Sequence, residues 1–273
     1  MKKVSRAACA IILCATTLTL ADASTMPTTT TASATQGATI NDDARAILAR
    51  IDRAYSAATS VRLRATVING FDVAGRVNED KNEVIASTDG LHFSHELVGR
   101  GRVTCAIAGV FLYDYTRDVY ATFPAPTQRT AQDIDQAVVD VLLEENPALL
   151  LSLTDAPSEL LSLHAKSLER GRDEDELLIE RDDDADVRLR LDKTTGRVVE
   201  AVIDFEPVFV SRLATTRPAN TARRATITLR YIPDATPVDA SAFDWRPPSS
   251  AELIELPREL LMPTPADAPT TQP

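Results

Sequence analysis

The sequence predicts an α+β protein built on a strongly curved antiparallel β-sheet, with helices packed on the concave face of the sheet. Apolar residues recur with a period of two over most of the chain, which is typical of strands with one solvated face. The period changes to that of an amphipathic helix at the start of the folded region and again in its middle. Runs of strands interrupted by one helical stretch indicate a single α+β domain.

The first 23 residues have the features of a secretory signal peptide. Lys2, Lys3 and Arg6 precede an uncharged run, and small residues precede the expected cleavage site after Ala23. The uncharged run is too short for a stable membrane span of about 20 residues. We therefore expect an exported protein without a transmembrane segment after cleavage.

The folded domain is expected to span residues 41–256. Residues 24–40 are rich in Thr, Ala and Ser, and residues 257–273 are rich in Pro, Thr and Ala. Neither stretch shows an apolar period that could build a core. The sequence therefore predicts a disordered leader before the domain and a disordered tail after it.

A first helix is expected after Asn41, which is a suitable N-cap and is followed by two aspartates in the first turn. Its apolar residues share one face: Ile47, Leu48, Ile51 and Tyr55. From Ser60 onward the period is two. We expect antiparallel strands over residues 61–67, 91–97, 103–107, 111–115 and 119–123.

Helical spacing returns near Thr130 and predicts a second helix that extends to Leu142. Asn146 is then expected to cap a short third helix with Pro147 in its first position. This short helix is leucine-rich almost all round, so it must be covered on several sides. Strands resume over residues 177–179, 187–191, 199–205 and 225–231.

The charge and cysteine content exclude several classes of protein. The net charge is −11, and the expected signal peptide removes three basic residues and one acidic residue, which leaves −13. Such a charge makes nucleic acid an unsuitable partner. Cys105 alone remains after cleavage, so an intramolecular disulfide is excluded, and its strand pattern predicts an inward-facing side chain.

Catalytic and metal-binding patterns are absent from the sequence. Ser94 and His95 are adjacent on a predicted strand, so they point to opposite faces and do not form a nucleophile and base pair. His92 and His164 have no partner at metal-ligand spacing. The acidic stretch 182–186 lacks the glycine and the distal glutamate of a calcium loop. We expect no enzyme, no cofactor and no metal.

Three segments, taken in order, carry a resemblance to a known family: residues 111–115 followed by 119–121, residues 187–192 with Gly196, and residues 242–248. Together they resemble the LolA/LolB-like superfamily of periplasmic lipoprotein carriers. The resemblance is greater to a family of predicted periplasmic proteins of unknown function beside these carriers. It implies a periplasmic protein with a half-open β-barrel and an interior that, in the carriers, holds the acyl chains of a lipoprotein.

The residue pattern leaves open whether the inward-facing apolar residues line a cavity or fill a core, and the resemblance favours a cavity. The candidate lining residues are Phe93, Phe111, Tyr113, Val138, Leu142, Leu149, Leu150, Phe205 and Trp245. The leading hypothesis is a non-enzymatic binding protein that holds a lipid or a lipoprotein acyl chain between the sheet and a helical lid. The alternative is an envelope protein-interaction or sensor module with a filled core.

Overall fold

The computed structural model describes residues 38–56, 60–73, 76–97, 101–106, 108–115, 117–181, 185–205, 222–234 and 236–254. The expected signal peptide, most of the expected leader and the expected tail lie outside these ranges. Residues 182–184 of the acidic stretch also lie outside them.

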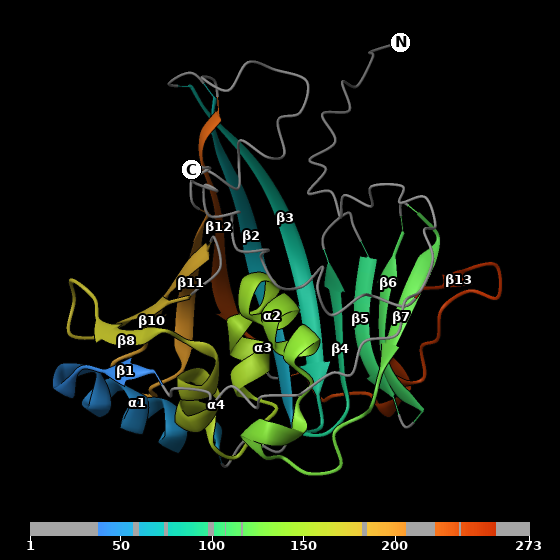
Figure 1. Ribbon diagram of the computed structural model, residues 1–273, viewed down its shortest axis with the longest axis horizontal. Helices are drawn as coiled ribbons and strands as arrows, with labels where there is room; N and C mark the ends of the chain where they lie inside the picture. Colours follow the sequence, from blue (N-terminus) through green and yellow to red (C-terminus); the bar gives the residue numbers. More distant parts are fainter. Residues whose placement is uncertain are drawn as a thin grey trace, which may run out of the picture.

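All strands of the described residues belong to one sheet, which does not close on itself (Figure 1). The strands are β1 (Thr39–Ile40), β2 (Val61–Val73), β3 (Arg76–Thr88), β4 (Phe93–Leu97), β5 (Gly101–Ala106), β6 (Gly109–Asp114), β7 (Val119–Phe123), β8 (Ser167–Arg170), β9 (Glu176–Glu180), β10 (Ala185–Leu191), β11 (Val198–Phe205), β12 (Ala222–Pro233) and β13 (Glu252–Leu253). Their order in this 13-stranded sheet is β1-β8-β9-β10-β11-β12-β2-β3-β4-β5-β6-β7-β13.

The predicted α+β class is confirmed, but the sheet is not purely antiparallel. Its two outermost pairs are parallel, because β1 pairs with β8 and β13 pairs with β7. A strand of two residues is too short to show an alternating pattern, so the sequence indicated neither of them. Strand β1 also places Thr39 and Ile40 in the sheet, although the sequence analysis assigned both to the disordered leader.

Besides β1 and β13, three longer elements were not predicted from the sequence: β3, β8 and helix α4. Strand β3 pairs with β2 along its whole length, although the sequence of residues 76–83 is mostly polar. Because β3 has no clear apolar alternation in this part, its position follows from its hydrogen bonds to β2. The long β2–β3 hairpin therefore extends beyond the expected strand 61–67.

The helices are α1 (Asp42–Tyr55), α2 (Gln136–Glu145), α3 (Pro147–Leu151) and α4 (Pro157–His164), with short 3₁₀ turns η1 (Ala131–Asp133) and η2 (Ala240–Phe243). Helix α1 begins as predicted, because the side-chain oxygen of Asn41 accepts a hydrogen bond of 3.0 Å from the N–H of Asp43. Asn146 alone separates α2 from α3. It ends α2 and caps α3, which has the expected proline in its first position.

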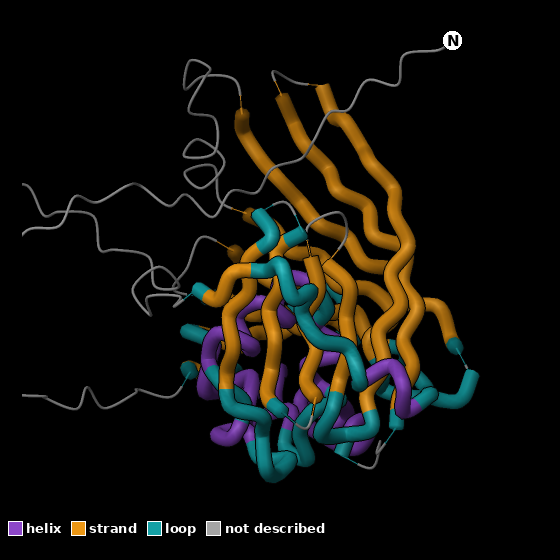
Figure 2. Tube along the Cα trace, turned by 90° about the vertical axis from the view of Figure 1, so that its right-hand side faces the viewer, coloured by secondary structure: helices purple, strands orange, loops and turns teal. Residues whose placement is uncertain are grey.

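The helices contact strands from β8, near one border of the sheet, to β3 near its centre. Helix α1 contacts β8, β9 and α4, α2 contacts β10 and α3, and α3 contacts β3. Helices α2 and α3 lie in front of the central strands in Figure 1, and β2, β3 and β12 extend far beyond them. Figure 2 shows the same separation from the side, with the helices near one end of the long strands.

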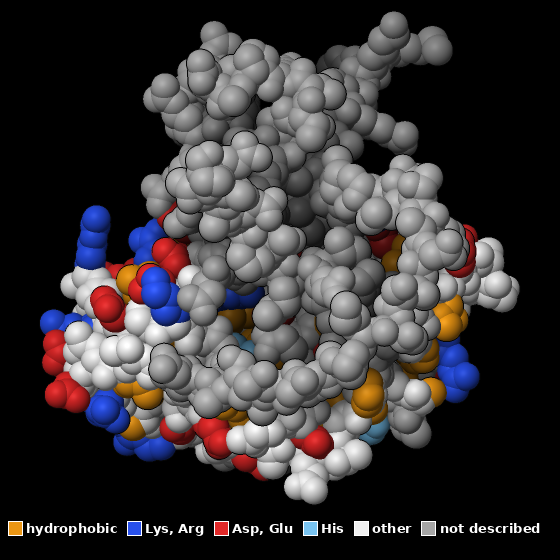
Figure 3. Space-filling model, in the orientation of Figure 1, with side chains coloured by type: hydrophobic (Ala, Val, Ile, Leu, Met, Phe, Trp, Pro, Cys, Tyr) orange, Lys and Arg blue, Asp and Glu red, His pale blue; other side chains and the backbone are white. Residues whose placement is uncertain are grey.

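The two faces of the sheet differ in chemistry, as the alternation predicts. On one face, inward-facing side chains such as Leu189, Ala201 and Leu229 join one apolar cluster with the helices. On the other face, Glu200 forms ion pairs with Arg190 at 3.4 Å and Arg230 at 2.9 Å. Acidic and basic side chains lie side by side on the molecular surface in Figure 3.

Helix α1 approaches the β10–β11 turn so closely that the turn requires glycine at position 196. Gly196 has φ of 71°, and a Cβ atom there would lie 2.9 Å from the carbonyl oxygen of Arg50 in α1.

We expect Gly196→Ala to lower the free energy of unfolding by about 1–3 kcal/mol, which urea denaturation measures. Gly171→Ala is the matched control, because its new Cβ would meet the flexible side chain of Glu176 instead of backbone. An equal loss in both variants would contradict this account.

Candidate functional site

Six of the nine candidate residues come together in the apolar cluster between the helices and the sheet. All six are at most 5% exposed: Phe93, Val138, Leu142, Leu149, Leu150 and Phe205. Phe93 and Phe205 come from strands on opposite sides of β2 and β3, and the others come from α2 and α3. Cys105 faces the same cluster, as predicted, and burial raises the pKa of its thiol to about 12.

The structure places Phe111, Tyr113 and Trp245 outside this cluster. Val110 and Leu112 of β6 pack on the apolar cluster, so Phe111 and Tyr113, which alternate with them, face the opposite side of the sheet. Trp245 joins Tyr113 there, with their ring centroids 5.7 Å apart. Because β6 carries large apolar side chains on both faces, the period-two pattern could not decide which face is internal.

Tyr113 of β6 and Trp245 of the segment after β12 form an outer cluster, while the Phe111 ring lies against Tyr120 with ring centroids 6.3 Å apart. The guanidinium group of Arg102 lies 5.3 Å from the centre of the Trp245 ring, within the range of a cation–π interaction. The hydroxyl of Tyr113 donates a hydrogen bond of 2.7 Å to Asp118, and this bond raises the pKa of Tyr113 to about 12. The outer cluster therefore fixes the C-terminal segment to the sheet.

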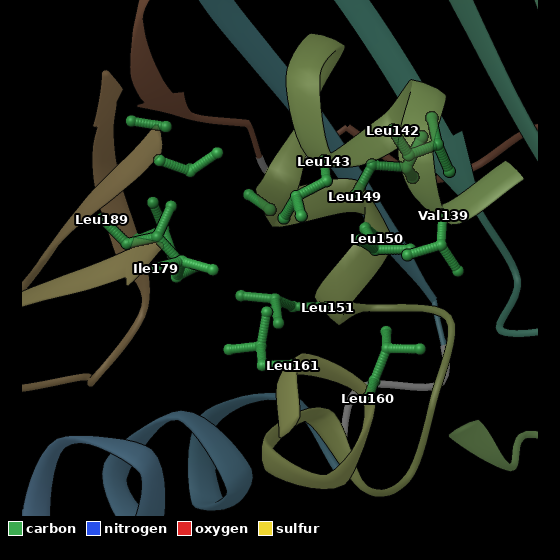
Figure 4. Packing of buried hydrophobic residues seen from close by; sticks show 14 of the residues in the cluster. Val139, Leu142, Leu143, Leu149, Leu150, Leu151, Leu160, Leu161, Ile179 and Leu189 are labelled. Carbon is green, nitrogen blue, oxygen red and sulfur yellow. The ribbon is translucent and has the colours of Figure 1, made fainter. Parts of the chain in front are cut away.

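The leucines of α2, α3 and α4 fill the space next to the sheet. The exposed fraction of Leu142, Leu149 and Leu150 is 0%, so no space large enough for a water molecule adjoins them. Figure 4 shows the leucines of the three helices converging with Ile179 and Leu189 of the sheet. The helices of this structure are therefore fully seated on the sheet.

A buried polar network lies at the junction of α2 and α3. The side-chain oxygen of Asn146 accepts hydrogen bonds from the N–H of Leu149 at 3.2 Å and from the hydroxyl of Tyr231 at 3.0 Å. The amide nitrogen of Asn146 lies 3.4 Å from Nδ1 of His95. The Tyr231 hydroxyl also accepts a hydrogen bond of 3.3 Å from the N–H of Ala148. The Asn146 side chain thus connects the start of α3 to two strands, while its backbone N–H donates to Leu142 at the end of α2.

The sequence predicted Asn146 as a cap but not its hydrogen bonds to His95 and Tyr231. His95 and Tyr231 each lie in a row of inward-facing apolar residues, and His95 is only 1% exposed. A polar side chain on the internal face of a strand needs a hydrogen-bond partner, which was the available signal. Ser94 has the opposite orientation to His95, as predicted, and accepts hydrogen bonds from Arg102.

An ion-pair cluster attaches α2 to the end of β9. The buried side chain of Arg181 contacts Asp140 at 3.2 Å and Glu144 at 3.4 Å, both on α2. Burial raises the pKa of Asp140 despite the attraction of Arg181. At the end of α4, burial and the charge of Arg181 lower the pKa of His164 to about 4.

Neither a metal-binding cluster nor a membrane-spanning helix occurs among the described residues. No group of three or more His, Cys, Asp or Glu side chains in these ranges could hold a metal ion. Within the same ranges, each helix is too short or too polar to cross a membrane.

Comparisons with known proteins gave similarities at the level of structure. No family model and no curated protein matches the sequence. An uncharacterized conserved protein from Thermus thermophilus is 12% identical, with a TM-score of 0.37, and the match covers 78% of this chain and 99% of that protein. A LolA superfamily protein from Nitrosomonas europaea is 12% identical, with a TM-score of 0.30, over 81% of this chain and 97% of that protein.

A DUF1329 family protein from Desulfovibrio piger is also 12% identical, with a TM-score of 0.31, over 74% of this chain and 100% of that protein. A LolA superfamily protein is thus among the structures to which this chain is similar.

The lowered pKa of His164 predicts a loss of stability in weak acid. The imidazole has a pKa of about 4 in the folded protein and 6.5 as a reference, so the unfolded chain binds more protons between these values. The free energy of unfolding should therefore fall as the pH is lowered from about 6.5 to 4. Urea denaturation across this range should show a smaller decrease for His164→Gln. Parallel pH profiles for the two proteins would contradict the prediction.

Proposed function

We propose that this protein is an exported, periplasmic, non-enzymatic binding protein that holds a lipid or a lipoprotein acyl chain. The binding site would lie between the concave face of the sheet and the helical lid formed by α2 and α3. The main support is the continuous aliphatic surface that these helices share with a sheet that does not close. The lining we propose comprises Phe93, Val138, Leu142, Leu149, Leu150 and Phe205.

The contacts of Asn146 support a concave surface beneath the lid. Its partners His95 and Tyr231 lie on β4 and β12, which β2 and β3 separate in the sheet. Strands that are three positions apart would be about 14 Å apart in a flat sheet. One short side chain reaches both partners more readily where the strands curve toward it.

Aliphatic surface on both the lid and the sheet suits an acyl chain as the ligand. An acyl chain that takes the place of lid leucines gains about 0.8 kcal/mol for each methylene that leaves water, or about 8 kcal/mol for about ten methylenes. The ligand can thus offset the leucine contacts that are lost when the lid moves. Leu142, Leu149 and Leu150 leave no room for a ligand while they are seated, so uptake requires movement of α2 and α3.

The same full burial favours a second candidate function. Leucines that expose none of their surface are also typical of a permanently filled core. In that case the scaffold would be an interaction or sensor module that presents its surface to an envelope protein. The two functions differ in whether the interior ever accepts an apolar molecule.

The first experiment is mass spectrometry of organic extracts of residues 24–273, purified from a bacterial periplasm without detergent. A lipid in about equimolar amount is the expected result, because an apolar ligand should remain bound in the absence of detergent. An empty protein that also fails to bind the apolar fluorophore N-phenyl-1-naphthylamine would favour the interaction module.

A charge placed in the proposed lining should abolish binding. We expect Leu150→Asp to lose the fluorescence increase of N-phenyl-1-naphthylamine, because a carboxylate beside an acyl chain loses its hydration. The circular dichroism of the sheet should persist. Leu163→Asp is the matched control, because Leu163 lies on α4 and is 36% exposed. Unchanged fluorophore binding by Leu150→Asp would contradict the proposed site.

A further inference from the structure

Asn146 lies between the two helices of the lid, and its side chain bonds to the first turn of α3, to Tyr231 of β12 and to His95 of β4. We propose that Asn146, Tyr231 and His95 form a latch that keeps α2 and α3 closed and releases them when β4 and β12 move apart. This inference rests on the proposed function, because it assigns the gate of the same site.

The hydrogen bonds fix the orientation of the Asn146 amide. Its oxygen accepts from the Leu149 N–H and from the Tyr231 hydroxyl, so the atom that faces His95 is the amide nitrogen. An amide nitrogen only donates, so Nδ1 of His95 is the acceptor in this pair. The Tyr231 hydroxyl in turn accepts from the N–H of Ala148. The latch thus holds the first turn of α3 from two sides.

Small residues on β2 and β3, the strands between Tyr231 and His95, leave room for the start of α3 to lie close to the sheet. Ala65 of β2 is paired with Tyr231, and Ala86 of β3 is paired with His95. Both alanines are at most 1% exposed, and α3 contacts β3. Larger side chains at these two positions would lift the start of α3 and lengthen the hydrogen bonds of Asn146.

Hydrogen bonds and leucine contacts respond differently to movement of the sheet. Apolar contacts are not directional, so leucines can slide on the sheet with little loss. Hydrogen bonds weaken steeply as the distance between donor and acceptor grows, and a buried network is stable only when its members are satisfied. Two bonds of the latch are already long, at 3.3 Å and 3.4 Å, so a small further separation of the strands would break them. An acyl chain that separates β4 from β12 would break the latch and leave only the leucine contacts on the lid.

The two ends of the latch lie on strands that do not pair with each other. Strands β12 and β4 are each hydrogen-bonded to other neighbours, and β2 and β3 lie between them. The distance between Tyr231 and His95 therefore depends on the curvature of this part of the sheet. Because the latch stabilises only the closed lid, weakening its hydrogen bonds should increase the population of the open lid.

The test compares Tyr231→Phe with Tyr55→Phe in the exported chain, residues 24–273. Both phenols accept a buried backbone hydrogen bond, Tyr231 from Ala148 in the lid and Tyr55 from Val198 in β11. We expect amide hydrogen exchange at Leu149 and Leu150 to become about fivefold faster in Tyr231→Phe, the change that loss of one net hydrogen bond produces. Exchange at these amides should not change in Tyr55→Phe.

An unchanged exchange rate in Tyr231→Phe, or equal acceleration in both variants, would overturn the latch. Hydrogen exchange needs no ligand, so it tests the latch separately from the proposed function. The uptake rate of N-phenyl-1-naphthylamine should also rise about fivefold in Tyr231→Phe alone. Faster exchange without fluorophore binding in any variant would support the latch and overturn the binding function. Binding at equal rates with unchanged exchange would support the function and overturn the latch.

Discussion

The apolar face of a sheet that does not close must be covered, and most other features of this structure follow from that requirement. The inward-facing residues of β9, β10, β11 and β12 form one cluster with the leucines of α2, α3 and α4. Those helices are leucine-rich on several sides because they contact the sheet and one another. The opposite face of the same strands carries ion pairs and needs no cover.

Apolar burial alone does not fix where the covering helices lie, because it has no preferred direction. Polar contacts at two positions supply that direction. Arg181 holds α2 at the end of β9, and Asn146 holds the α2–α3 junction over the central strands. A misplaced helix would leave the buried guanidinium and amide groups without their partners, which costs more than the loss of a few apolar contacts.

The ends of the domain cover the exposed borders of the sheet. Strands β1 and β13 are short, come from opposite ends of the domain and pair in parallel with β8 and β7. The segment that leads to β13 also covers the outer cluster around Tyr113 and Trp245. Tyr113 and Trp245, which the sequence suggested as cavity-lining residues, instead attach the C-terminal segment to the sheet. The proposed binding surface is accordingly confined to the apolar cluster on the other face.

The sequence by itself determined the α+β class, the inward face of strands such as β10 and β11, and the cap at Asn146, because these depend on local period and local hydrogen bonds. It could not locate β3, whose polar sequence is held in the sheet by pairing with β2. Nor could it assign Phe111 and Tyr113 to a face, because β6 is apolar on both sides. Only the tertiary structure brought Asn146 to His95 and Tyr231, which are 51 and 85 residues away in the chain. Such contacts depend on the curvature of the whole sheet, which no local pattern encodes.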